Sequence, residues 1–122
     1  NELVVINDLD NIERLICNNN KIKNIGLYPN LIFLDCKNNL LTNINLYEKI
    51  TELYCSNNHI VLLHKQNKLK ILECIETDIQ KVPFCEKLRE ILCDMSLTQI
   101  SAKFKVDTIK FYKSKYLYYT FV

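Results

Sequence analysis

The sequence has few of the residues that several kinds of functional site require. One Gly occurs among the 122 residues, so no Gly-rich loop that cradles a phosphate group is present. No apolar run approaches the roughly 20 residues needed to cross a bilayer. Residues 1–10 also lack the basic start and the apolar stretch of a signal peptide. We therefore expect a soluble protein that does not contact a membrane.

Cysteine is plentiful by contrast, and its placement is regular. Five of the six Cys residues lie 19 residues apart, and Phe111 takes the same place 18 residues after the last of them. A fixed period of this length indicates a solenoid of stacked repeats. An apolar residue stands two positions before each of these sites, and Asn, Thr or Ser stands three positions after it. The regularly spaced residues are Cys17, Cys36, Cys55, Cys74 and Cys93.

The spacing argues against a disulfide framework. A single repeat position that accepts a small apolar side chain predicts free thiols in the core. Because rows of buried thiols are easiest to maintain in a reducing compartment, we expect an intracellular, cytoplasmic protein. Abundant Asn, Ile, Lys and Tyr indicate AT-rich coding sequence, as in large DNA viruses and some protists, and a viral protein would act in the host cell. Cys85 lies outside the spacing, either as an exposed reactive thiol or as a buried apolar filler.

Each repeat predicts one short strand followed by a bend. The Leu-x-Cys segments of repeats one to five, within residues 12–100, should form parallel strands with Leu and Cys pointing inward. The Asn after each strand, such as Asn39, turns the chain, and its amide can bond backbone groups of its own and the adjacent coil. Thr77 can do this only in part. The return segments are too short for a regular helix, so we expect extended or 3-10 structure there.

The two ends of the chain depart from this pattern. Residues 1–11 are either a partial repeat or an N-terminal cap. The fifth repeat lacks one residue after its Cys, so Ile100 should take the place that Val82 has in the fourth. Residues 101–122 form a divergent last repeat and C-terminal cap, in which Tyr119 is expected at that same place.

The pattern Leu-x-x-Leu-x-Cys-x-x-Asn-x-Leu, as it stands from Leu31 to Leu41, resembles the leucine-rich repeat family with Cys in place of the third Leu. The match covers residues 12 to 119 and is similar to the short, Cys-type repeats of that family. The resemblance implies one domain over residues 1–122. It implies a right-handed, curved stack of about six repeats with a parallel β-sheet on its concave face. It also implies protein binding, and no catalytic residue carries over.

Outward-facing residues of the concave sheet are the candidate binding surface, because a rigid scaffold holds them and the core does not use them. Large apolar side chains alternate there with carboxylates, as in many protein interfaces. The alternative interpretation is that these apolar residues are β-formers placed on a sheet for propensity alone. The candidate residues are Phe33, Asp35, Glu52, Tyr54, Ile71, Glu73, Glu90 and Leu92.

Other kinds of chemistry find less support in the sequence. His59 and His64 fall on different parts of one coil, with no nucleophile or set of metal ligands nearby. Four carboxylates on neighbouring strands could perform acid–base chemistry or hold a cation, but a solvated acidic patch that selects a basic partner is the simpler interpretation. They are Glu73, Glu76, Glu90 and Asp94. We therefore expect a protein that is not an enzyme and that holds no metal or cofactor.

Two alternative functions stay open. Lys residues among Phe and Tyr in residues 101–122, with Asp107 as the one acidic residue, are typical of single-stranded nucleic-acid binding. They also suit a last repeat that closes the core with large rings and keeps its edge soluble, and the small net charge of +2 favours this second account. A start without Met suits a recognition domain of a larger host-directed effector or multidomain protein. The leading prediction is a monomeric, non-catalytic module that binds a protein partner.

Overall fold

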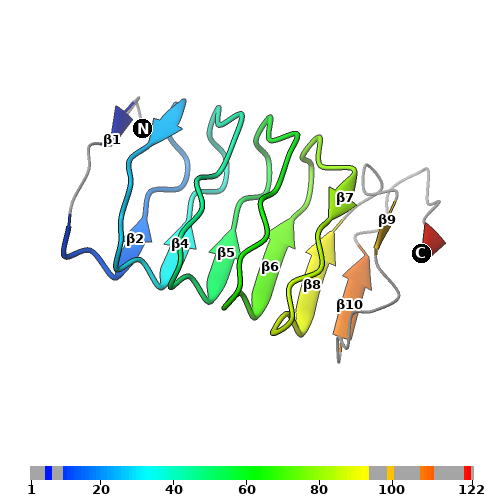
Figure 1. Cartoon of the computed structure of the whole chain (residues 1–122). Coiled ribbons are helices and arrows are strands. Elements are labelled where there is room, and N and C mark those ends of the chain that lie inside the picture. Colours follow the sequence, from blue (N-terminus) through cyan, green and yellow to red (C-terminus); the bar gives the residue numbers. More distant parts are fainter. Residues whose placement is uncertain (1–4, 7–9, 94–98, 101–107, 112–119, 122) are drawn as a thin grey trace.

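The computed structural model describes residues 5–6, 10–93, 99–100, 108–111 and 120–121, with side chains described for residues 10–93. These residues form a parallel β-solenoid of about four turns, and none of them is helical. The expected solenoid with extended return segments is therefore confirmed over this part of the chain (Figure 1).

Six short strands lie side by side and point in the same direction (Figure 1). This long sheet contains β2 (Arg14–Ile16), β4 (Phe33–Asp35), β5 (Glu52–Tyr54), β6 (Ile71–Cys74), β8 (Glu90–Cys93) and β10 (Thr108–Phe111), in that order. Leu34 pairs with Leu53 and Leu53 with Leu72, so equivalent repeat positions are neighbours. Phe111 pairs with Cys93, which confirms the place that the sequence gave to this aromatic residue.

The return side carries shorter strands. β1 (Val5–Ile6) pairs with β3 (Asn24–Ile25), and β7 (Lys81–Val82), β9 (Gln99–Ile100) and β11 (Thr120–Phe121) form a second small sheet. Ile100 pairs with Val82, as expected from the missing residue in the fifth repeat. The expectation for Tyr119 was wrong, because Phe121 is the residue that pairs with Ile100. The last coil is thus longer between its two strands than the repeat pattern indicates.

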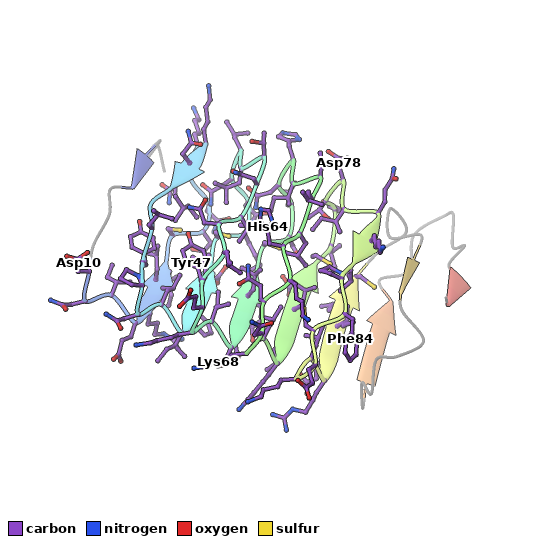
Figure 2. All side chains as sticks on the ribbon, in the orientation of Figure 1. Asp10, Tyr47, His64, Lys68, Asp78 and Phe84 are labelled. Atoms are coloured by element: carbon purple, nitrogen blue, oxygen red, sulfur yellow. The ribbon has the colours of Figure 1, made fainter. Side chains whose placement is uncertain are left out.

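The core lies between the long sheet and the return side. Along each strand the side chains alternate, so that Leu34 and Cys36 are fully buried while Phe33 and Asp35 are half-buried on the other face. Fully burying one Leu side chain contributes about 1.5–3 kcal/mol, and the same inward positions recur in every coil. The sulfur atoms lie in the interior of the stack (Figure 2).

A second buried column, which the sequence analysis missed, lines the return side at the same 19-residue spacing. Each of its members begins a tight turn in which the amide three residues later donates to its carbonyl, as from Leu31 to Tyr28 at 3.1 Å. The rings of Tyr28 and Tyr47 stack at 6.1 Å, and buried Gln66 accepts from the Tyr47 amide at 3.1 Å. The column consists of Tyr28, Tyr47, Gln66 and Cys85. Cys85 is therefore a buried filler in a register of its own.

Buried Asn side chains join each coil to the one before it. The Nδ2 of Asn58 donates to the carbonyl of Cys55 in its own coil at 3.1 Å and to that of Cys36 in the preceding coil at 3.0 Å. Its Oδ1 accepts from the Leu41 amide at 2.9 Å. Asn39 repeats the pattern one coil earlier. The Thr77 hydroxyl keeps the local part by donating to Cys74 O at 3.1 Å. The expected role of Asn is confirmed.

The residue before each buried Asn has a left-handed backbone, and its side chain forms an exposed ladder. Asn19, Asn38 and Asn57 have φ values of 57°, 57° and 54°, and Glu76 has 53° in the next coil. Asn57 donates to Asn38 and Asn38 donates to Asn19, each at 2.7 Å. Asn tolerates this backbone region better than most residues because its short polar side chain bonds locally. The Asn-Asn pair thus serves two different structural needs.

Replacing Asn58 by Ala should lower the free energy of unfolding by about 3 kcal/mol, because buried carbonyl and amide groups of two coils lose their partner. Urea denaturation followed by circular dichroism measures this change. The control is Asn67→Ala in an exposed turn, for which a change within about 0.5 kcal/mol is expected. Equal losses for the two variants would contradict the role given to the buried amide.

Replacing Glu76 by Asn should raise the free energy of unfolding by about 0.5–1 kcal/mol, because Asn suits a positive φ and continues the ladder above Asn57. The reverse exchange, Asn57→Glu, should lower it by a similar or larger amount. Thermal melts of both variants beside the native chain test the pair. A Glu76→Asn variant that melts below the native chain would show that backbone preference does not decide this position.

Candidate binding face on the long sheet

The predicted site residues lie on one surface, the outer face of the long sheet, where the strand pairing arranges them in two rows. Pairing across β4, β5, β6 and β8 gives a first row and a second row, and neighbours within a row are roughly 5 Å apart. The first row is Phe33, Glu52, Ile71 and Glu90, and the second is Asp35, Tyr54, Glu73 and Leu92. All except the exposed Glu90 are half-buried.

Aromatic and cationic groups stack at the N-terminal end of this face. The Arg14 guanidinium lies over the Phe33 ring, with its Cζ 3.8 Å from the ring centroid. The Phe33 and Tyr54 rings are 5.4 Å apart and tilted by 41°. The Lys37 ammonium is 5.8 Å from the Tyr54 ring and 4.0 Å from an Asp35 oxygen. The face thus already holds one guanidinium on an aromatic ring of the adjacent strand.

The carboxylates further along the face accept hydrogen bonds from hydroxyl groups. The Tyr54 hydroxyl donates to Glu52 at 2.8 Å, and the Ser56 hydroxyl donates to Glu73 at 2.8 Å. Ser56 also accepts from the Ile75 amide at 2.9 Å, which fixes its position. Burial raises the pKa of Tyr54 to about 12, and the nearby carboxylates, Glu52 first, add to the shift. The phenol is therefore a neutral, oriented donor.

A hollow of about 150 Å³ opens on the outer face over β5, β6 and β8. Five of the eight predicted residues line it: Tyr54, Ile71, Glu73, Glu90 and Leu92. Glu52 adjoins it through its bond to Tyr54, whereas Phe33 and Asp35 lie on β4 beyond it. The hollow combines an aromatic ring, apolar walls and two carboxylates, so it suits a ligand with both apolar and cationic parts.

The other candidate chemistries do not assemble. Glu73 and Glu90 share the hollow, but Glu76 is exposed in the bend after β6. His59 and His64 are both exposed. Within the described residues, no group of three or more His, Cys, Asp or Glu side chains is placed to hold a metal ion. Asp94 and most of the basic, aromatic segment 101–122 lie outside the described residues.

Two surfaces away from the outer face were not foreseen from the sequence. Leu27 and Leu46, which are 60% and 54% exposed, border an apolar hollow of about 510 Å³ on the return side. Basic side chains line the edge where the strands of the long sheet begin, near the labelled Lys68 (Figure 2). They are Lys49, Lys65, Lys68, Lys70, Lys87 and Arg89. The 19-residue period, applied to exposed positions, would have revealed both surfaces.

The thiols are protected from reaction. All six cysteines are free and buried. Burial is the main cause that raises the pKa of Cys17 to about 11 and the pKa values of Cys36 and Cys55 well above the ordinary 9.0. Burial also raises the pKa of Cys85. Because the thiolate is the reactive form, none of these groups has the properties of a nucleophile or redox sensor.

Comparisons of the chain with protein-family profiles, with curated proteins and with solved structures found no match. In the part of the chain that the structure describes, no helix is long and apolar enough to cross a membrane. The site is therefore argued from its own geometry.

Alkaline pH should destabilise the protein because its buried thiols hold their protons. Unfolded thiols release protons near pH 9, whereas the folded ones do so at higher pH. Above about pH 9 the unfolded chain binds fewer protons, so stability falls by up to about 1.4 kcal/mol per pH unit for each thiol. Urea unfolding across this range, under reducing conditions, gives the slope. A Cys36→Val, Cys55→Val variant should show a shallower slope, and an unchanged slope would contradict this origin.

Proposed function

We propose that the chain is a leucine-rich repeat solenoid, right-handed and curved, of about six turns, that binds a protein partner through the outer face of its long sheet. Three features support the repeat assignment. The positions of the motif Leu31-x-x-Leu34-x-Cys36 are all buried. The motif Asn39 bonds two coils, and the period of 19 residues is kept in successive strands. In this reading, the outer face is the concave side.

The observation that carries the binding proposal is the alternation of half-buried apolar and acidic side chains across four adjacent strands. Residues placed on a sheet for propensity alone would show no organised contacts. Here Phe33 packs between Arg14 and Tyr54, and Tyr54 is bonded to Glu52. Such preorganised aromatic side chains lose little entropy on binding and act as anchors in protein interfaces. The hollow beside them adds a concave element.

A non-catalytic role fits the same surface. The carboxylates Glu73 and Glu90 lie on an open, shallow face, and acid–base catalysis needs a pocket that excludes water around the reacting group. The Tyr54 phenol is held neutral by its surroundings. The site therefore suits recognition, with a solvated polar border around apolar anchors.

Affinity capture from a lysate of the source cells tests this proposal with two matched variants. One carries Phe33→Ala, Tyr54→Ala and Ile71→Glu on the outer face, and the other carries Val61→Glu and Leu62→Glu on the return side. Val61 and Leu62 are each 64% exposed, so the control changes surface polarity without touching the core. Circular dichroism establishes first that both variants fold.

The native chain and the return-side variant should retain the same protein, and the outer-face variant should retain at least about tenfold less, since buried anchors typically contribute more than 1.4 kcal/mol. Retention by all three chains would place the function elsewhere. Loss in the return-side variant alone would point to the return side.

A further inference from the structure

Resting on this proposed function, we propose that the hollow over β5, β6 and β8 receives an arginine side chain of the partner protein. The hollow is lined by Tyr54, Ile71, Glu73, Glu90 and Leu92. Its volume of about 150 Å³ suits one side chain and is too small for a helix or a second strand. The proposal thus names the chemistry of one anchor residue on the partner.

The arrangement of the lining residues supports a cation with an apolar stem. Glu52 pairs with Ile71 and Ile71 with Glu90 in the first row, and Tyr54 pairs with Glu73 and Glu73 with Leu92 in the second. Apolar and acidic side chains therefore alternate in both directions. An arginine stem can pack on Ile71 and Leu92 while its guanidinium lies among the carboxylates and over the Tyr54 ring.

The carboxylates of the hollow are not neutralised by nearby cations within the described residues. Glu73 accepts from the Ser56 hydroxyl and Glu52 from the Tyr54 hydroxyl, and both donors are uncharged. No Lys or Arg of the described residues lines the hollow. Lys37 instead pairs with Asp35 on β4. A guanidinium entering the hollow would therefore gain attraction from several carboxylates at once.

The chain itself shows that this face accepts a guanidinium. Arg14 lies 3.8 Å from the centroid of the Phe33 ring, one position along the same surface. Arginine suits the hollow better than lysine because its planar group stacks on a ring and bonds carboxylates in pairs. A metal ion fits less well, since the carboxylates alternate with apolar side chains and do not form a cage.

Nuclear magnetic resonance titration with N-acetyl-arginine methylamide tests the proposal, and N-acetyl-citrulline methylamide is the matched probe because citrulline has nearly the same shape without the charge. The arginine probe should shift the backbone amide signals of residues 54, 71–73 and 90–92 in a saturable manner. The citrulline probe should bind at least about tenfold more weakly. Equal binding of the two probes, or shifts confined to other residues, would overturn the proposal.

Two charge variants examine the same hollow. Glu73→Gln with Glu90→Gln should weaken arginine binding at least about fivefold, since two charge-assisted contacts are lost. Glu48→Gln with Glu86→Gln removes equal charge from exposed turn positions outside the hollow and should leave binding unchanged. Equal weakening by both pairs would reduce the effect to overall charge and overturn the site.

A third variant addresses the chain's own cation on the adjacent strand. Lys110 of β10 pairs in register with Leu92. Arginine binding that appears only in Lys110→Gln would mean that the chain fills its own hollow, which would also overturn the proposal. Binding by the native chain supports it.

The inference and the proposed function fail in different ways. If the outer-face variant releases the captured protein but the arginine probe does not shift the hollow amides, the binding face stands and the arginine anchor is wrong. If the outer-face variant retains the protein, the proposed function fails, whatever the titration shows.

Discussion

Each coil of the solenoid satisfies its backbone polar groups by lying in register on the next coil. Buried Asn side chains make this register specific, because the amide of Asn58 bonds the carbonyls of Cys36 and Cys55, one in each of two coils. A coil shifted by one residue would bury unpaired carbonyl and amide groups, each at a cost of about 1–3 kcal/mol. The stack therefore tolerates a change of length only where it is absorbed outside the strands. The residue missing after Cys93 is such a change, since β8 keeps its pairing with β10.

Once the register is fixed, the outward positions become a lattice with constant spacing. The core constrains Leu53 and Cys55 but not Glu52 or Tyr54, so the outer rows can vary in chemistry without loss of the fold. Neighbours on this lattice come from residues 19 apart in the sequence. The alternation of Glu52, Ile71 and Glu90 is thus a property of three coils together and is not visible in any one of them.

The sequence predicted much of the scaffold because its signals are local and repeated. Leu and Cys two residues apart give an inward-facing strand in every coil, and the Asn three residues later gives the bend. The column of Tyr47, Gln66 and Cys85 escaped because its members share a turn position but not a chemical type. The place of Phe121 was also missed, since no repeat motif marks the longer final coil.

The site was predicted in part. The outward rows follow from strand alternation, so all eight residues were assigned to one surface. Which of them form a hollow depends on how far each side chain rises from the sheet. Tyr54 leans toward Glu52 to form its hydrogen bond, while Phe33 is covered by Arg14. Such contacts between neighbouring side chains cannot be read from the order of residues, and they separate β4 from the hollow.

The acidic hollow borders the basic edge where the strands begin, and this contrast constrains how a partner can bind. Lys70 precedes Ile71, and Arg89 precedes Glu90, so the sign of the charge reverses within one residue of the hollow. A partner that places arginine over Glu73 and Glu90 gains further attraction if acidic residues follow toward Lys70, and meets repulsion if basic residues do. Because the opposing charges nearly cancel in the net charge of +2, they contribute little to long-range attraction. Their effect is to fix the orientation of a bound segment.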